Sequence, residues 1–158
     1  MKILLKQIMA RYRREGAPME PTSNSTEKYK KSGLTQEQAL VIKQRIDYAL
    51  GHEKLYRNNE IGLGDLATFI QQDRYKVSEV INTYYAKNFY ALLNSYRIEE
   101  AKNLLINNPM LSVKAIMYEV GFNSKNSFYM AFKRNTGVSP NDFRIMTAYN
   151  FQGSQLAS

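Results

Sequence analysis

The sequence contains no cysteine and no tryptophan, and His52 is its single histidine. Without cysteine the chain can form neither disulfides nor thiolate metal sites, and a lone histidine without clustered carboxylates does not hold a metal ion. No set of nucleophile, base and orienting residue can be assembled around His52 either. We therefore expect no metal, no cofactor and no enzymatic activity.

Long apolar runs are missing as well. No stretch approaches the roughly 20 apolar residues of a membrane-spanning helix. The first ten residues are too short and too interrupted by charge for a secretory leader. Both absences, together with the lack of cysteine, favour a cytosolic protein.

Positive charge is what the chain has in excess. Its net charge of +8 points to a polyanionic partner such as nucleic acid or an anionic membrane surface. Residues 1–31 hold eight of the 22 Lys and Arg but three of the 14 acids, which leaves 14 bases and 11 acids for the rest. A stretch rich in Pro, Ser and Thr follows residue 16, so residues 1–27 are expected to be a basic tail and linker. Such a tail either grips a polyanion or is simply solvated, and charge alone does not establish DNA binding.

From Thr35 onward the apolar residues follow a helical period. Thr35 and Gln38 form a capping box for a helix that Gly51 is expected to end. Further helices are predicted at 63–71, 74–85, 88–107, 113–120, 124–135 and 142–147, with Asp73, Ser112 and Pro140 among their start signals. Because no segment alternates as a strand does, the sequence predicts an all-α fold.

An internal repeat organises this helical part. A shift of 51 residues makes structural positions coincide: Val77 with Phe128, Ile81 with Phe132, Ala86 with Gly137, Asn88 with Ser139, and Leu92 with Phe143. Each unit consists of a short helix, a tight turn and a second helix, which is typical of a helix-turn-helix. Gly121 supplies the positive φ that such a turn requires, whereas Gln71 in the equivalent place needs either strain or a different turn.

The second unit carries an ordered set of motifs. They are Gly121-Phe122, Phe128, Phe132-Lys133-Arg134, Gly137-Val138-Ser139-Pro140 and Phe143-Arg144, and the preceding helix adds Tyr96-Arg97, Ala101 and Leu104-Leu105. This set resembles the C-terminal DNA-binding domain of the AraC-type (AraC/XylS) transcription regulators, and the resemblance covers about residues 28–147. It implies two helix-turn-helix subdomains, joined by one long helix, that read successive major-groove segments of double-stranded DNA.

The resemblance also implies a domain organisation. After the tail and linker of residues 1–27, the DNA-binding domain is expected at 28–150 and a C-terminal tail at 151–158. Within the domain, the first helix-turn-helix spans 61–86, the connector helix 88–107 and the second helix-turn-helix 111–137. We expect a fragment or a stand-alone short regulator, because the sensor or effector domain of the family is not present in this chain. RNA polymerase is a further candidate partner, and the chain is cytoplasmic or the cytoplasmic part of a membrane-anchored regulator.

The outward side of each second helix is expected to meet DNA. Contacts with base edges are predicted for Tyr75, Ser78 and Glu79, where the resemblance places them, and for Lys125, Asn126, Tyr129 and Met130. Contacts with phosphates are predicted for Arg74, Lys76, Asn82, Asn88, Ser124, Lys133, Arg134 and Ser139. The chemistry fits, since lysine suits guanine acceptors, asparagine suits adenine, and helix N-termini offer N–H groups to phosphates.

Three points stay open on the sequence alone. Glu79 replaces a residue that is often basic in the family, so it either accepts from cytosine or merely sits beside the groove. Met130 stands where the family often carries arginine, so one guanine contact is expected to be missing. The alternative function is a protein-interaction module in which one helix-turn-helix has lost DNA affinity. Because no acid lies between Val120 and Pro140, the second unit is the stronger candidate for reading DNA.

Overall fold

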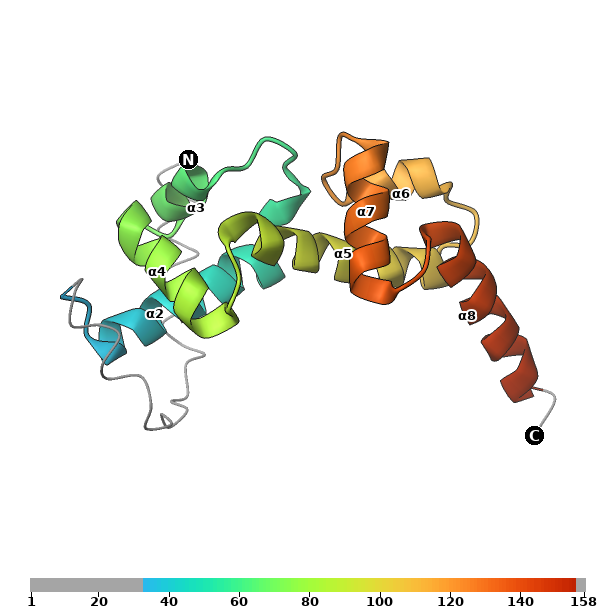
Figure 1. Ribbon diagram of the computed structural model, residues 1–158, viewed down its shortest axis with the longest axis horizontal. Helices are drawn as coiled ribbons and strands as arrows, with labels where there is room; N and C mark the ends of the chain where they lie inside the picture. The colour runs from blue at the N-terminus through green and yellow to red at the C-terminus, as the bar shows by residue number, and fades with distance from the viewer. Residues whose placement is uncertain (1–32, 156–158) are drawn as a thin grey trace. The chain divides into compact units, whose positions relative to one another are not determined.

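The computed structural model describes residues 33–155, with side chains described as far as residue 148 (Figure 1). The predicted basic tail, residues 1–27, lies outside the described residues. Every regular element in the described range is helical, so the all-α prediction is confirmed there. In chain order the elements are α2 (Gln36–Asp47), the π-helix η2 (Tyr48–His52), the 3₁₀-helix η3 (Leu55–Arg57), α3 (Leu63–Phe69), α4 (Arg74–Tyr85), α5 (Phe89–Asn107), α6 (Val113–Glu119), α7 (Lys125–Thr136) and α8 (Pro140–Gln155).

The helix α2 begins with the predicted capping box. The Thr35 hydroxyl accepts from the Gln38 N–H at 3.2 Å, and the Gln38 side chain accepts from the Thr35 N–H at 3.2 Å. The prediction that Gly51 ends this helix is wrong, because the chain continues as a π-helix to His52. Gly51 does not adopt a positive φ. The wider π turn keeps Ala49 and Leu50 fully buried.

The two helix-turn-helix units repeat with a register shift at the turn. The first helices, α3 and α6, start 50 residues apart, at Leu63 and Val113, whereas the second helices, α4 and α7, start 51 apart, at Arg74 and Lys125. The second turn is therefore one residue longer than the first. Both turns pass through a positive φ, at Gln71 (55°) and at Gly121 (92°). Gln71 thus tolerates the strained conformation rather than forming a different type of turn.

The helix α5 lies between the two units and packs against both. It contacts α4 of the first unit and α6, α7 and α8 on the side of the second unit (Figure 1). Around its C-terminal half, ten buried residues form the core of the second unit: Ile98, Ala101, Leu105, Ile116, Met117, Val120, Phe122, Phe128, Ala131 and Phe132. Three of these are phenylalanines, and Phe143 of α8 adds an edge-on contact with Phe132 at 5.5 Å. One helix therefore contributes to the packing of both units.

A polar cluster fastens α2 to the first unit. One Asp47 carboxylate oxygen accepts from the Tyr85 hydroxyl at 2.8 Å and from the Tyr96 hydroxyl at 3.3 Å, and the other pairs with the Lys43 ammonium at 2.8 Å. Burial, followed by the nearby Asp47 charge, raises the pKa of Tyr96 to about 12. Both phenols therefore stay neutral donors, and they join α2 to α4 and α5.

The last helix is longer than the sequence suggested. It was predicted at 142–147, but α8 runs from Pro140 to Gln155 and enters the segment assigned to a C-terminal tail. Proline at the first helical position lacks only an N–H that would have no partner inside the helix. No glycine or proline follows before Gly153, so nothing in the sequence stops the helix at 147. Among the described residues, no helix is long and apolar enough to cross a membrane.

Candidate nucleic-acid interface

The helix α4 buries one side and leaves the predicted contact residues on the other. Asp73 caps its N-terminus by accepting from the N–H groups of Tyr75 and Lys76. Val77, Val80 and Ile81 are fully buried. Of the predicted residues on this helix, three are exposed and three are half-buried: Arg74, Tyr75 and Asn82, and Lys76, Ser78 and Glu79. Tyr75 is 83% exposed, which is unusual for a tyrosine and leaves its whole ring free to contact a partner.

The helix α7 repeats this division with a more cationic outer side. Phe128, Ala131 and Phe132 are buried in the core. The predicted residues Lys125, Asn126, Met130, Lys133 and Arg134 are exposed. α7 contains no carboxylate, whereas Glu79 is the one acid on α4. The formal charge is therefore +3 on α7 against +1 on α4, and the higher positive charge attracts a polyanion more strongly.

Tyr129 is the one predicted base contact on α7 that is half-buried, and it contacts both a core residue and the predicted base contact Lys125. Its ring lies edge-on to Phe128, with the ring centres 5.8 Å apart, and the Lys125 ammonium lies 5.4 Å from its centre. It is half-buried at the margin of the core. Its contact with DNA is therefore limited to the part of the ring that stays accessible.

Three predicted phosphate contacts cap helices. The Asn88 side chain accepts from the Ala91 N–H at 2.8 Å, and the Ser124 hydroxyl accepts from the Ser127 N–H at 3.3 Å. The Ser139 hydroxyl accepts from the Asp142 N–H and donates to its carboxylate at 2.6 Å. These side-chain oxygens are occupied, so the first-turn N–H groups are what remains for a phosphate. The Asp142 carboxylate makes the N-terminus of α8 the least suitable of the three.

The cations on the outer sides of α4 and α7 have no acidic partner among the residues that the structure describes. Within the described part of the chain, Arg74, Lys76, Lys125, Lys133 and Arg134 make no ion pair. By contrast, Lys54 and Arg57, close to the contact between the units, both pair with Glu100. Unpaired cations on the outward helix faces are typical of a surface that binds a polyanion.

Arg97 joins the segment just before the first unit to the second unit, which the sequence did not predict. It is 7% exposed, and its guanidinium donates to the carbonyl oxygens of Tyr56 at 2.8 Å and Asn58 at 3.0 Å. The same group lies 5.2 Å from the centre of the Phe122 ring, which belongs to the turn of the second unit. Burial lowers the pKa of Arg97. The residue thus ties α5 to the loop around η3 on one side and to the second unit on the other.

Gly121 completes this contact between the units. A Cβ atom at this position would lie 2.4 Å from the Tyr56 carbonyl oxygen and 2.8 Å from that of Arg57. Both obstacles are backbone atoms, which cannot swing aside. The sequence predicted glycine at 121 only from the positive φ of the turn. The close approach of the loop is a second reason why no residue with a Cβ atom fits at this position.

An ion-pair cluster surrounds this contact. Arg57 pairs with Glu100 of α5 at 2.6 Å and with Glu119 of α6 at 3.0 Å, while Lys54 pairs with Glu100 at 2.8 Å. Hydrogen bonds from Lys54 and Arg57 hold the pKa of the Glu100 carboxyl below its ordinary value. The hydrogen bond with Glu100 likewise raises the pKa of Arg57. We name the set Arg97, Gly121, Arg57 and Glu100 the inter-unit contact, since it ties the segment that leads into the first unit to α5 and to the second unit.

Comparison with known proteins identifies the family. A family described as a helix-turn-helix domain matches residues 66–146, which is more than half of the chain. An uncharacterized HTH-type transcriptional regulator in the cgkA 5′ region of Pseudoalteromonas carrageenovora is 44% identical over 48 residues, or 30% of this chain and 27% of that protein. The match therefore spans about a quarter of that curated relative.

Solved structures with a similar fold include domains of regulators. The C-terminal domain of AraT, a response regulator from Geobacillus stearothermophilus, is 27% identical and covers 73% of this chain and 88% of that one, with a TM-score of 0.58. The C-terminal domain of the two-component response regulator yesN from Fusobacterium nucleatum is 23% identical, covers 70% and 99% of the two chains and has a TM-score of 0.54. A DNA-binding transcriptional dual regulator from Escherichia coli K-12 shares the fold at 17% identity, covering 68% and 93%, with a TM-score of 0.59.

These similarities agree with the motifs of the second unit and with the paired helix-turn-helix arrangement. Family and fold are those of DNA-binding regulators rather than of enzymes. The alternative of a protein-interaction module is not supported. The chain belongs to the AraC-type helix-turn-helix family of DNA-binding transcription regulators.

Proposed function

We propose that α4 and α7 enter two successive major-groove segments on one face of double-stranded DNA, with α5 setting their separation. The observation that carries this proposal is the pair of helix-turn-helix units on a single helix, each with an outward side whose cations are unpaired within the described range. Recognition helices about 34 Å apart meet successive turns of the major groove. One chain then reads both segments without forming a dimer.

Base reading by α7 follows from the chemistry of its outward side. Lys125 donates to guanine O6 and N7, and Asn126 pairs with adenine N6 and N7. Met130 and the accessible part of Tyr129 offer apolar contacts for a thymine methyl group. On α4, Tyr75, Ser78 and Glu79 occupy the corresponding positions, and the Glu79 carboxylate suits a cytosine amino group.

Phosphate contacts hold both helices in register. The side chains proposed for this role are Arg74, Lys76 and Asn82 beside α4, and Lys133 and Arg134 at the end of α7. The N-terminal turns that follow Asn88, Ser124 and Ser139 add backbone N–H donors. These contacts carry no sequence information, but they supply most of the salt-dependent affinity.

Selection of bound duplexes from a random pool tests the proposal. We expect one sequence with two conserved segments about 10 base pairs apart. Lys125→Ala and Asn126→Ala should each relax the preference at one base pair, by about 1–3 kcal/mol of discrimination. Lys133→Ala should weaken all duplexes alike and lower the salt slope by about one unit. Asn103→Ala, on the exposed side of α5, serves as the matched control for Asn126→Ala. A pool that yields no preferred sequence would contradict the proposal.

The remaining partners are proposed on the strength of the family. RNA polymerase is the partner through which such a regulator acts, and the cytoplasm is where its DNA lies. Two of the similar structures are C-terminal domains of response regulators. We therefore infer that a signal-receiving domain controls this one. Transcription in vitro from a promoter that carries the selected sequence tests the action on RNA polymerase. The protein should change the transcript level from this promoter, and it should have no effect when the selected sequence is placed far from the promoter.

A further inference from the structure

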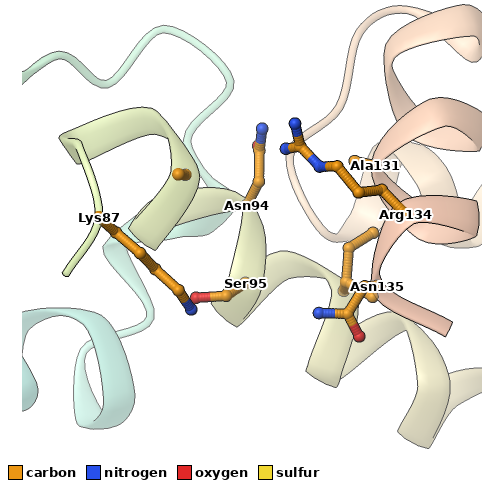
Figure 2. A pocket seen from close by; sticks show the side chains of 8 residues that line it. Lys87, Asn94, Ser95, Ala131, Arg134 and Asn135 are labelled. Atoms are coloured by element: carbon orange, nitrogen blue, oxygen red, sulfur yellow. The ribbon is translucent and has the colours of Figure 1, made fainter. Parts of the chain in front are cut away.

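A polar pocket lies between α5 and the C-terminal half of α7 (Figure 2). Its volume is about 220 Å³, and it is lined by Lys87, Ala91, Asn94, Ser95, Ile98, Ala131, Arg134 and Asn135. Because α5 packs against both α4 and α7, the pocket lies between the two proposed recognition helices. Lys87 enters it from the turn that follows α4, and Arg134 enters it from α7.

The lining of this pocket carries two cations and no carboxylate. Figure 2 shows the Arg134 guanidinium and the Asn94 amide pointing toward each other across the opening, with Lys87 directed toward Ser95 and Asn135 below Arg134. Neither Lys87 nor Arg134 makes an ion pair with any other described residue. Ile98 and Ala131 are the buried, apolar part of the lining. The lining thus combines cationic and amide donors with an apolar part, and it contains no acid that would compete for those donors.

This composition favours an anion with several acceptor oxygens. A guanidinium and an ammonium, supplemented by the side-chain amides of Asn94 and Asn135, match a phosphate group better than a carboxylate, which has two oxygens. The Ser95 hydroxyl is not counted among these donors, because it donates to the Leu92 carbonyl oxygen at 2.7 Å. The volume is below the roughly 300–1,000 Å³ of pockets that enclose drug-sized ligands. The pocket therefore fits one phosphate group rather than a whole small-molecule effector.

Its position indicates where that phosphate comes from. When two recognition helices lie in successive major-groove segments, the backbone between those segments passes over whatever joins the helices. Here the joining element is α5, and the rim residue Arg134 lies one turn beyond Met130 on the outward side of α7. We propose that the pocket binds a backbone phosphate of the DNA between the two major-groove segments, with Lys87, Asn94 and Arg134 as its main donors. This inference rests on the proposed function.

Binding by Lys87→Gln to the selected two-segment duplex is the first test. We expect an affinity about three- to tenfold lower than that of the unaltered protein, with the salt slope reduced by about one unit. Ala91→Met, which fills the pocket without changing the charge, should lower the affinity as well. Lys102→Gln is the matched control, because it removes the same charge from α5 at a residue that pairs with Glu99 and lies outside the pocket. Thermal unfolding of each variant verifies that the fold is intact.

Neutral methylphosphonate linkages identify the phosphate itself. These linkages are placed one at a time between the two segments. At one position the linkage should lower the DNA affinity of the unaltered protein and should not lower that of Lys87→Gln any further. If no position couples to Lys87 in this way, the proposal is overturned. It is also overturned if Lys87→Gln and Lys102→Gln bind DNA equally well. This holds even if inorganic phosphate, added at constant ionic strength, shifts the NMR signals of the pocket residues, because free phosphate would then occupy the pocket while the DNA backbone does not.

The same measurements separate this inference from the function it rests on. If the unaltered protein selects a duplex and Lys125→Ala relaxes its preference, the proposed function stands whatever Lys87 does. If no duplex is selected, the proposed function is contradicted by that experiment alone, independently of any result on the pocket.

Discussion

At the scale of single residues, Arg97 is the one charged side chain that is buried among the described residues. It makes no ion pair there, and its hydrogen bonds go to the backbone carbonyls of Tyr56 and Asn58. A guanidinium serves this role because its donors point in fixed directions, so that two of them reach separate carbonyls. The charge is tolerated because those carbonyls and the Phe122 ring replace part of its hydration.

Arg97→Lys should therefore be destabilising although the charge is kept. An ammonium has no counterpart of the fixed fork, so at least one buried carbonyl loses its partner, at a cost of about 1–3 kcal/mol. Urea unfolding followed by circular dichroism measures the change. Arg134→Lys, an equal exchange at an exposed position, should change the stability by less than about 0.5 kcal/mol. Equal effects of the two exchanges would contradict the role assigned to Arg97.

Glu100 gives the inter-unit contact a dependence on pH. Its pKa in the folded chain lies below the ordinary value of 4.5, first because of the hydrogen bond from Lys54 and then because of that from Arg57. A lowered folded pKa contributes stability above the unfolded value and loses it as pH falls through the folded value. The stabilisation is thus complete at neutral pH, begins to fall near pH 4.5 and is lost as pH drops through the lower pKa of the folded chain.

Glu100→Gln should accordingly be less stable than the unaltered protein at pH 7, by about 1 kcal/mol after allowance for the solvent exposure of Lys54 and Arg57. The difference should shrink as pH falls below 4.5, where the native carboxyl also becomes neutral. Unfolding curves from pH 3 to 8 check both statements. Glu99→Gln, whose side chain is 59% exposed and pairs with Lys102, is the matched control and should change the stability little at pH 7. A constant gap across the range would exclude ionisation as the cause.

At the scale of elements, the turns show how far the sequence determines local structure. Side-chain caps and the capping box are local interactions, so Thr35, Asp73 and Ser112 were identified as helix starts from sequence alone. The positive φ of Gly121 was predicted for the same reason. The π turn after Asp47 was not predicted, because it depends on burying Ala49 and Leu50 against other elements. The full length of α8 was missed because the sequence carries no stop signal to place its end.

Two glycines allow the strain of a turn to be separated from the contact between units. Gly121 and Gly137 both have a positive φ, of 92° and 82°, but only Gly121 has backbone atoms where a Cβ would stand. Gly137→Ala should lose about 1 kcal/mol, the conformational term alone. Gly121→Ala should lose at least about 2 kcal/mol more, because the loop at Tyr56 and Arg57 must move away. Equal losses in thermal or urea unfolding would mean that the close approach does not matter.

At the scale of the whole DNA-binding domain, the question is what fixes one unit relative to the other. The helix α5 alone sets the separation of the two units, but it does not set the rotation of one unit about the helix axis relative to the other. The inter-unit contact adds a second connection, from η3 through Arg57 to Glu100 of α5 and Glu119 of α6. Together, the two connections fix the relative orientation of the units as well as their separation. The sequence predicted α5 from its periodicity, yet the second connection joins residues 43 and 62 positions apart, and no local pattern reports such a pairing.

Loosening this connection should lower the affinity for a two-segment duplex more than the affinity for a duplex with one segment. Arg57→Gln should leave the affinity for a duplex with one segment nearly unchanged and lower that for the two-segment duplex about threefold to tenfold, since the second helix then meets its groove less often in the correct orientation. Lys102→Gln removes the same charge elsewhere and should lower neither selectively. Mobility-shift titrations with both duplexes measure the ratio. A parallel loss on both duplexes would point to simple charge loss.

The close approach at Gly121 also has a consequence for how the protein tolerates mutation. The atoms that Gly121 meets are carbonyl groups, which every amino acid possesses, so the fit makes no demand on the side chains at positions 56 and 57 themselves. In a randomised library every residue but glycine should be rejected at 121, whereas replacing Arg57 should cost only its ion pairs with Glu100 and Glu119. A substitution at 121 therefore displaces the backbone of the facing loop, whereas a substitution at 57 weakens one contact and leaves that backbone in place.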